Sequence, residues 1–152
     1  MKSGFRITVL VLLTLLSQAC SEQACYDDTD PLVNVILLES GTGAAKTSIS
    51  LKITGLAGVT PVDLVTATAV TKFSIPLNPA QETSVIVILL NGIADTATIS
   101  YTNFIHLVSP ECGYTFYSTI NSLNTTHNII DSLIIENKNI TVDGERNMRL
   151  FY

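Results

Sequence analysis

The sequence TATISYT at residues 96–102 alternates polar and apolar side chains without interruption. One face of this stretch carries Ala97, Ile99 and Tyr101, and the other carries only threonine and serine. A repeat of two residues is the period of a β-strand that buries one face and exposes the other. The stretch therefore predicts a half-buried strand.

Two neighbouring stretches extend this prediction to a sheet. SISLKIT at residues 48–54 alternates in the same way, which is expected to place Ile49, Leu51 and Ile53 on one face. VIVILL at residues 85–90 is instead a continuous apolar run rich in β-branched residues. Such a run is typical of a central strand that is covered on both faces.

The rest of the chain contains further short apolar runs separated by turn residues. The dipeptides Asn91-Gly92 and Asp143-Gly144 are typical of hairpin turns. Residues 75–79 contain two prolines that cannot donate to a strand ladder, so a connection or an edge strand is expected there. Other strands are expected at residues 32–38, 64–69, 104–108, 114–120, 129–135 and 148–152. This pattern predicts an all-β fold, an antiparallel β-sandwich that is immunoglobulin-like in general architecture.

The first nineteen residues have the composition of a cleaved signal peptide. Lys2 and Arg6 form a basic start, and an uncharged apolar run follows at residues 7–16. A membrane-spanning helix needs about 20 apolar residues, which is more than this run supplies, so cleavage is the better interpretation. The expected organisation is a lipoprotein signal peptide at residues 1–19, a lipidated acidic tether at 20–31 and a β-sandwich domain at 32–152.

Cys20 stands directly after the small residue Ala19 at the end of this leader. Lipoprotein processing requires this arrangement: the thiol receives a diacylglycerol, and the chain is cut before the cysteine. The motif departs from the usual pattern, because Leu16 lies four residues before the cysteine rather than three and Gln18 occupies a position usually held by Ala, Ser or Thr. Cys20 is the expected lipid attachment site. The alternative is an ordinary secretory signal, cut after Ala19, that leaves Cys20 as a free thiol.

The mature chain is acidic. Removal of Lys2 and Arg6 with the leader leaves six basic residues against 13 acidic ones, a net charge of −7. This charge repels nucleic acid and anionic lipid head groups. We therefore expect no nucleic-acid partner, and we expect attachment to a membrane only through the lipid on Cys20.

Two cysteines remain once Cys20 carries the lipid. Cys25 and Cys112 are enough for one disulfide, and an oxidising envelope favours its formation. We predict that they pair and thereby fix the end of the acidic tether to the turn at residues 111–113. The alternative is a pair of unbonded thiols.

The inventory of catalytic residues is small. None of the common nucleophile, zinc-protease, redox-dithiol or phosphate-loop spacings is present. His106 falls in an apolar strand, and His127 falls in the polar segment at residues 124–128. A hydrolase would need one of them beside a hydroxyl nucleophile and an acid, and a zinc site would need further ligands. The expectation is a protein that is not an enzyme, with no catalytic residue and no cofactor.

The start of the tether partly resembles a calcium-binding loop. Residues 28–30 read Asp-Thr-Asp, and Glu39 stands at the twelfth position, where a bidentate ligand belongs. However, Leu32 occupies a ligand position and Val33 replaces the glycine of the sharp turn. The segment is therefore expected to be a solvated acidic tether that binds no metal.

Several segments together resemble a known family. They are Cys20 with Cys25, Ile75 to Pro79, Asp95 to Thr102, Val108 to Gly113, and Thr126 to Asn128. These segments resemble a family of small Bacteroidota lipoproteins classed as a domain of unknown function, over nearly the whole mature chain. The resemblance implies a β-rich domain in the cell envelope and transfers no catalytic residue.

The sequence leads to two expectations about function. The first is a non-enzymatic binding or structural module of the cell envelope, held by lipid at the outer membrane, with a protein or glycan partner. The alternative is a carrier of a small hydrophobic ligand in a cavity of the β-domain. The chain contains no Trp and only 7% aromatic residues, which disfavours a stacked sugar site.

Overall fold

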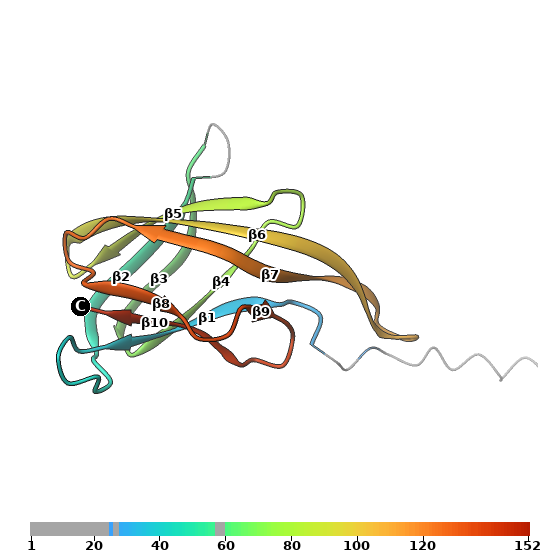
Figure 1. Ribbon diagram of the computed structural model, residues 1–152, viewed down its shortest axis with the longest axis horizontal. Helices are drawn as coiled ribbons and strands as arrows, with labels where there is room; N and C mark the ends of the chain where they lie inside the picture. The colour runs from blue at the N-terminus through green and yellow to red at the C-terminus, as the bar shows by residue number, and fades with distance from the viewer. Residues whose placement is uncertain (1–24, 26–27, 57–59) are drawn as a thin grey trace, which may run out of the picture.

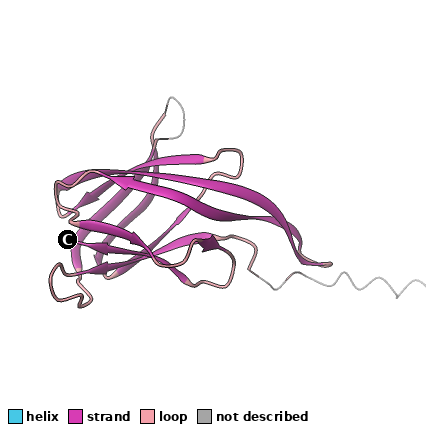
Figure 2. Cartoon of the chain, viewed as in Figure 1, coloured by secondary structure: helices cyan, strands magenta, loops and turns pink. Residues whose placement is uncertain are grey.

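The computed structural model describes residues 25, 28–56 and 60–152 (Figure 1). The predicted signal peptide and Cys20 lie outside these residues. The described part of the chain forms strands and loops only (Figure 2), and no helix in it is long and apolar enough to cross a membrane. The strands are β1 (Leu32–Leu38), β2 (Ser48–Gly55), β3 (Val62–Val70), β4 (Lys72–Pro76), β5 (Thr83–Leu90), β6 (Ile93–Ser109), β7 (Gly113–Thr125), β8 (Ser132–Ile135), β9 (Asn139–Ile140) and β10 (Arg146–Phe151).

The strands form two sheets, which confirms the prediction of an all-β fold. One sheet has four strands in the order β4-β1-β10-β8, and the other has six in the order β3-β2-β5-β6-β7-β9. All neighbours run antiparallel except β1 and β10, which are parallel. This one pair departs from the antiparallel arrangement of the predicted sandwich. Because β1 and β10 are the first and last strands, the chain between them is long enough for the crossover that parallel strands need.

The core lies between the two sheets. Ala97, Ile99 and Tyr101 are buried on one face of β6, as the alternation predicts. The apolar residues of the other strands meet them from both sheets, and the same cluster includes Val33, Val35, Leu37, Leu51, Ile53, Phe73, Ile75, Ile86, Ile88, Leu90, Ile120, Ile130, Ile140, Met148, Leu150 and Tyr152. Side chains of both sheets thus fill the space between them.

β5 is central in its sheet but is covered on one face only. Ile86, Ile88 and Leu90 are buried, whereas Leu89 between them is 36% exposed. The prediction that residues 85–90 are covered on both faces is wrong. The second sheet packs against one side of β5, and the opposite side has no covering layer among the described residues.

Ile49 does not join the buried face of β2. Its side chain is 80% exposed, although Leu51 and Ile53 are buried as predicted. The pairing between β2 and β5 ends at Leu51 and Leu90, so Ile49 lies beyond the covered part of the strand. The side chain of Asn91 accepts hydrogen bonds from the N–H groups of Ile49 (2.8 Å) and of the next residue, and so fixes the strand end.

The two predicted hairpin turns have different outcomes. Asn91 and Gly92 join β5 to β6 with positive φ angles of 51° and 87°, as a type I′ hairpin turn requires. Asp143 and Gly144 form a turn, but the flanking strands β9 and β10 belong to different sheets, so the prediction of a hairpin there is wrong. The predicted edge is confirmed: β4 ends at Pro76 and forms one edge of the four-stranded sheet.

The predicted strands at residues 96–102 and 104–108 are one strand. β6 runs for 17 residues, because polar Asn103 between the two apolar stretches finds hydrogen-bond partners without leaving the ladder. The strand expected at residues 129–135 is shorter than predicted and begins at Ser132. β6 and its partner β7 are the two longest strands, and their outer halves extend beyond the neighbouring strands.

Candidate functional site

The outer half of the β6–β7 pair projects beyond the sandwich (Figure 1). β5 pairs with β6 only as far as Ser100, and β9 pairs with β7 only at Ser118 and Thr119. Residues 104–117 therefore form a two-stranded ribbon, which we call the distal hairpin. A hairpin without further strands is marginally stable in water, so other contacts must support it.

Three kinds of contact support the distal hairpin. The rings of His106 and Tyr117 stack with their centroids 4.2 Å apart, and Phe104 meets Tyr117 edge to face at 6.1 Å. The hydroxyl of Thr115 donates a 2.6 Å hydrogen bond to the carbonyl of Thr29 in the N-terminal segment. The third contact is covalent and lies at the tip.

Cys25 and Cys112 are joined by a disulfide, with their Cα atoms 4.7 Å apart. The predicted pairing is therefore present. Cys112 belongs to the turn between β6 and β7, whereas Cys25 precedes β1 in the chain. The N-terminal segment is thus attached to the hairpin tip before it enters the four-stranded sheet.

The distal hairpin exposes large apolar side chains. The register places Ile105 opposite Phe116 and Leu107 opposite Tyr114, so these four share one face of the ribbon. Together with Phe104, they are between 45% and 72% exposed. From Tyr101 to Thr125, Glu111 is the only Asp, Glu, Lys or Arg. Exposed apolar patches of this kind often mark surfaces that bind another protein, a ligand or a membrane.

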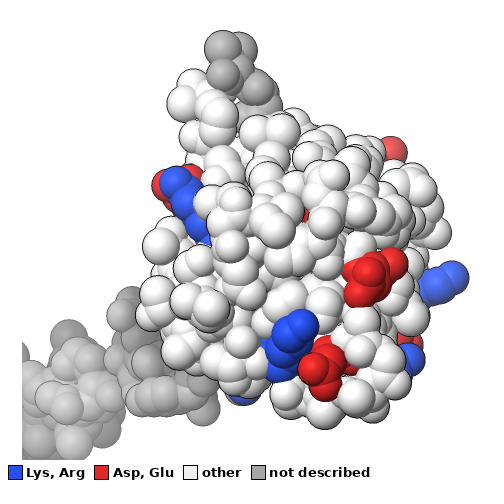
Figure 3. All heavy atoms as spheres, turned by 90° about the vertical axis from the view of Figure 1, so that its left-hand side faces the viewer, with Lys and Arg blue, Asp and Glu red and all other residues white. Residues whose placement is uncertain are grey.

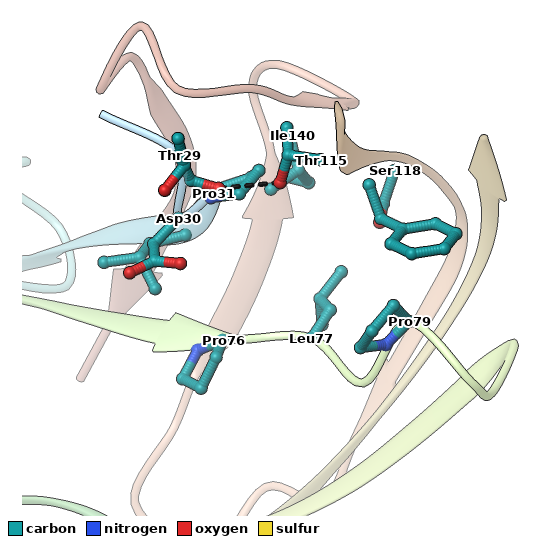
Figure 4. Close-up of a pocket in the computed structure, with 11 residues that line it drawn as sticks. Thr29, Asp30, Pro31, Pro76, Leu77, Pro79, Thr115, Ser118 and Ile140 are labelled. Atoms are coloured by element: carbon teal, nitrogen blue, oxygen red, sulfur yellow. Dashed lines mark hydrogen bonds between the residues drawn. The ribbon is translucent and has the colours of Figure 1, made fainter. Parts of the chain in front are cut away.

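A hollow of about 340 Å³, which we call the basal hollow, lies where the distal hairpin meets the sandwich (Figure 4). Its lining comes from the N-terminal segment and the start of β1, from the end of β4 and the linker after it, and from β7 and β9. The residues are 29–32; Pro76, Leu77 and Pro79; Thr115, Phe116 and Ser118; and Ile140. Leu77 points into the hollow, and the Thr115 to Thr29 hydrogen bond closes one side.

One wall of the basal hollow is held by side chains of β6. The amide of Asn103 donates to the carbonyls of Pro79 (3.1 Å) and Gln81 (2.6 Å), and its oxygen accepts from the hydroxyl of Ser118 (2.6 Å). The hydroxyl of Tyr101 donates to the carbonyl of Asn78 (3.0 Å), and burial raises the pKa of this phenol. The linker is therefore fixed on β6, and the hollow is preformed.

A second polar cluster surrounds Asp95, which is 1% exposed near the start of β6. Its carboxylate accepts hydrogen bonds from the hydroxyl of Thr126 (2.5 Å) and from the N–H groups of Asn128 (2.8 Å), Ile129 (2.8 Å) and Ile130 (2.9 Å). Burial acts to raise its pKa, but these four hydrogen bonds outweigh burial and lower the pKa to about 2. The carboxylate is used to hold the loop after β7.

No pattern in the sequence predicts the role of Asp95. Two of the segments that carry the family resemblance, beginning at Asp95 and at Thr126, meet in this cluster. In the sequence, Asp95 is only a carboxylate that precedes a strand of alternating polar and apolar residues. Its partners lie 31 to 35 residues further along the chain, so spacing alone does not reveal them.

The two histidines are far apart. His106 pairs with Thr115 in the distal hairpin, whereas Thr125, two residues before His127, pairs with Ala97 at the other end of β6. Positions 97 and 106 are nine residues apart along an extended strand, which is about 30 Å. Nδ1 of His127 lies 2.9 Å from the carbonyl of Ile130. The fold therefore does not bring the two imidazoles into one site.

The possible ligands of a calcium loop are also separated. Asp28 accepts a hydrogen bond from the N–H of Asp30 before β1, and Glu39 accepts one from Thr42 after it. The seven residues of β1 lie between them, and an extended strand of that length spans about 23 Å. In the ranges 28–56 and 60–152 and at residue 25, no group of three or more His, Cys, Asp or Glu residues could hold a metal ion.

The end of the molecule opposite the hairpin tip carries few charges (Figure 3). Most of the blue atoms on this face lie near red atoms, and some red atoms stand apart from any blue ones. Among the described residues, Lys52 pairs with Asp63 (2.9 Å) and Arg146 pairs with Glu136 (2.5 Å), so each of these exposed cations has a carboxylate beside it. This face therefore carries no concentration of positive charge.

Comparison with known proteins gives one match. A family model described as a family of unknown function, DUF6452, matches residues 50–152. No curated protein and no solved structure matches the chain. The matched range runs from β2 to the C-terminus and includes the distal hairpin and the Asp95 cluster.

Proposed function

Because the chain belongs to the family of unknown function DUF6452, which brings no activity with it, we propose a function from the residues themselves. The protein is a Bacteroidota cell-envelope lipoprotein, anchored by a lipid on Cys20. Its β-sandwich acts as a binding or structural module and not as an enzyme. The expected location is the outer membrane.

The observation that carries this proposal is the disulfide between Cys25 and Cys112. Disulfides of this structural kind persist in oxidising compartments, which include the bacterial periplasm and the cell surface. An exported protein needs a leader, and residues 1–19 have the composition of one. Cys20 at the end of that leader then serves for lipid attachment.

The basal hollow is the best candidate for contact with a partner protein or glycan. Its wall is held by Asn103 and Tyr101 before any partner arrives, which reduces the entropy lost on binding. The alternative function is that of a carrier for a small hydrophobic ligand. The hollow could hold such a ligand, because its volume of about 340 Å³ is at the lower end of the range for ligand pockets. It is the weaker candidate, because core side chains fill the space between the sheets.

Replacement of Cys20 by alanine is expected to abolish membrane attachment. The wild-type protein should gain the mass of a diacylglycerol at residue 20 and sediment with membranes, whereas Cys20→Ala should do neither, because no other thiol follows the leader directly. Intact-protein mass spectrometry and membrane fractionation measure both effects.

Cys25→Ala is the matched control, since it removes a cysteine five residues further on and should keep both the lipid and the membrane attachment. A wild-type chain that begins at residue 20 with an unmodified thiol would disprove the lipoprotein proposal.

Replacement of both histidines should leave the function unchanged. His106 and His127 occupy different ends of the β6–β7 pair, so they cannot act together on one substrate. The double variant His106→Phe/His127→Ala, in which the phenyl ring can keep the stacking on Tyr117, is expected to complement a deletion strain as well as the wild type does. Circular dichroism checks that the variant is folded. Loss of complementation by a folded double variant would revive a catalytic or metal-binding function.

A further inference from the structure

The apolar patch of the distal hairpin lies close to the proposed anchor. Cys25 follows Cys20 by five residues, and five residues span at most about 18 Å in any conformation. The disulfide keeps the Cα atoms of Cys25 and Cys112 within 4.7 Å. If Cys20 carries a lipid, the tip of the distal hairpin cannot move far from the membrane surface.

We propose that the distal hairpin inserts its apolar face, formed by Ile105, Leu107, Tyr114 and Phe116, into the interface of the bilayer that holds the anchor. This inference rests on the proposed lipid at Cys20. The occupant of the patch is thus a lipid surface, and not a second copy of the chain or another protein.

The chemistry of the hairpin fits a lipid interface. Aromatic rings with a polar edge, such as Tyr114, are favoured at the boundary between acyl chains and water. Glu111 is the only Asp, Glu, Lys or Arg between Tyr101 and Thr125, so burial of these strands at the interface desolvates few charges. Attraction to anionic head groups is not needed and would be opposed by the acidic mature chain.

The geometry also fits. The apolar face lies on a ribbon that extends beyond both sheets, so it can enter the interface while the sandwich stays in water (Figure 1). Most backbone groups that face inward in the β6–β7 ladder pair across the ribbon, with an irregularity between Leu107 and Ser109. The ribbon also has free outer edges, which limits it to the polar interface rather than the hydrocarbon centre.

The absence of tryptophan from the sequence makes a direct test possible. Tyr114→Trp places a single fluorescent reporter on the apolar face, at a residue that is 72% exposed. Ile93→Trp is the matched control, because Ile93 is also exposed but begins β6 at the opposite end. Tyr114 lies opposite Leu107 in the β6–β7 ladder. Ile93 and Leu107 are fourteen residues apart on one extended strand, so the two reporter positions are about 46 Å apart.

Each full-length lipidated variant is reconstituted into vesicles of phosphatidylethanolamine and phosphatidylcholine, with the acyl chains of the phosphatidylcholine either plain or brominated. Bromine quenches tryptophan only on contact, so emission of Tyr114→Trp is expected to fall about twofold or more in brominated vesicles, and that of Ile93→Trp to stay unchanged. Addition of Leu107→Asp to the Tyr114→Trp variant is expected to remove the quenching, because a carboxylate opposite the reporter opposes insertion. Circular dichroism reports the folding of each variant.

Equal emission of Tyr114→Trp in plain and brominated vesicles would overturn the inference. A blue-shifted emission without quenching would overturn it as well and would show that protein covers the patch. Intact-protein mass spectrometry shows independently whether Cys20 carries the lipid. A chain without lipid overturns the proposed function and this inference with it, whereas a lipidated chain without quenching overturns only the inference.

Discussion

Asp95→Ala is expected to lower the free energy of unfolding by about 3–5 kcal/mol, because it leaves buried donors without an acceptor. The N–H groups of Ile129 and Ile130 donate to one carboxylate oxygen, and Asn128 and Thr126 donate to the other. Ile130 itself is fully buried in the core, so no solvent can replace the lost bond there. Chemical denaturation followed by circular dichroism measures the loss.

Asp63→Ala is the matched control for this variant. Asp63 is also an acidic residue of the six-stranded sheet, but it is exposed and its partner is the exposed Lys52. An exposed ion pair adds little to stability, so this variant should unfold close to the wild type. If the two variants lost similar stability, the Asp95 cluster would not have the structural role that we assign to it.

The pH dependence of stability follows from the same cluster. The hydrogen bonds lower the pKa of Asp95 to about 2, below the usual value of 3.8 that applies in the unfolded chain. A lowered pKa in the folded state means that the stabilisation is fully present above about pH 4 and is lost as the pH falls towards 2. A shift of this size corresponds to about 2 kcal/mol. Asp95→Asn should flatten the stability profile between these two pH values.

Removal of the disulfide is expected to lower the free energy of unfolding by about 2–4 kcal/mol. The bond closes a loop from residue 25 to residue 112, and the chain-entropy model assigns about 4.6 kcal/mol to a loop of this length. The observed loss should be smaller, because the reduced folded protein also gains freedom: both the N-terminal segment and the hairpin tip are released. The double variant Cys25→Ser/Cys112→Ser, compared with the wild type by chemical denaturation, measures this effect.

Hydrogen exchange should show where the disulfide acts. Without the bond, amide exchange is expected to rise in residues 104–117, where the ribbon has no neighbouring strand. It should stay slow in β5, which lies between β2 and β6 in the six-stranded sheet. Alkylation of Cys25 and Cys112 in the denatured protein without prior reduction would contradict the bond itself.

In the distal hairpin, the apolar pattern of the sequence predicts the strands correctly but predicts their burial wrongly. Residues 104–108 and 114–120 are apolar enough to predict strands, and they are strands. The same pattern normally indicates burial, yet Ile105 and Tyr114 are largely exposed. Burial depends on what lies above and beside a strand, and the distal hairpin extends beyond every neighbour in its sheet.

Asp95 shows a second limit. The sequence identifies a carboxylate near the start of a strand, but its charge is stabilised by backbone N–H groups of residues 128–130. Those groups point towards Asp95 only because β7 returns antiparallel to β6 and the loop after it closes over the strand end. A hydrogen bond between distant residues is a property of the folded chain, and no local pattern encodes it.

The sequence by itself determined most of the strands, the Asn91-Gly92 hairpin, the edge at Pro76 and the pairing of Cys25 with Cys112. Each of these follows from a simple feature of the sequence: side-chain alternation, the backbone freedom of a turn, a missing N–H donor, and the number of cysteines left once Cys20 is assigned to the lipid. Only the tertiary structure decided that β5 is covered on one face, that β1 and β10 run parallel, and that the distal hairpin projects with its apolar face uncovered. These features depend on which strands become neighbours, and that is set by the packing of two whole sheets around one core.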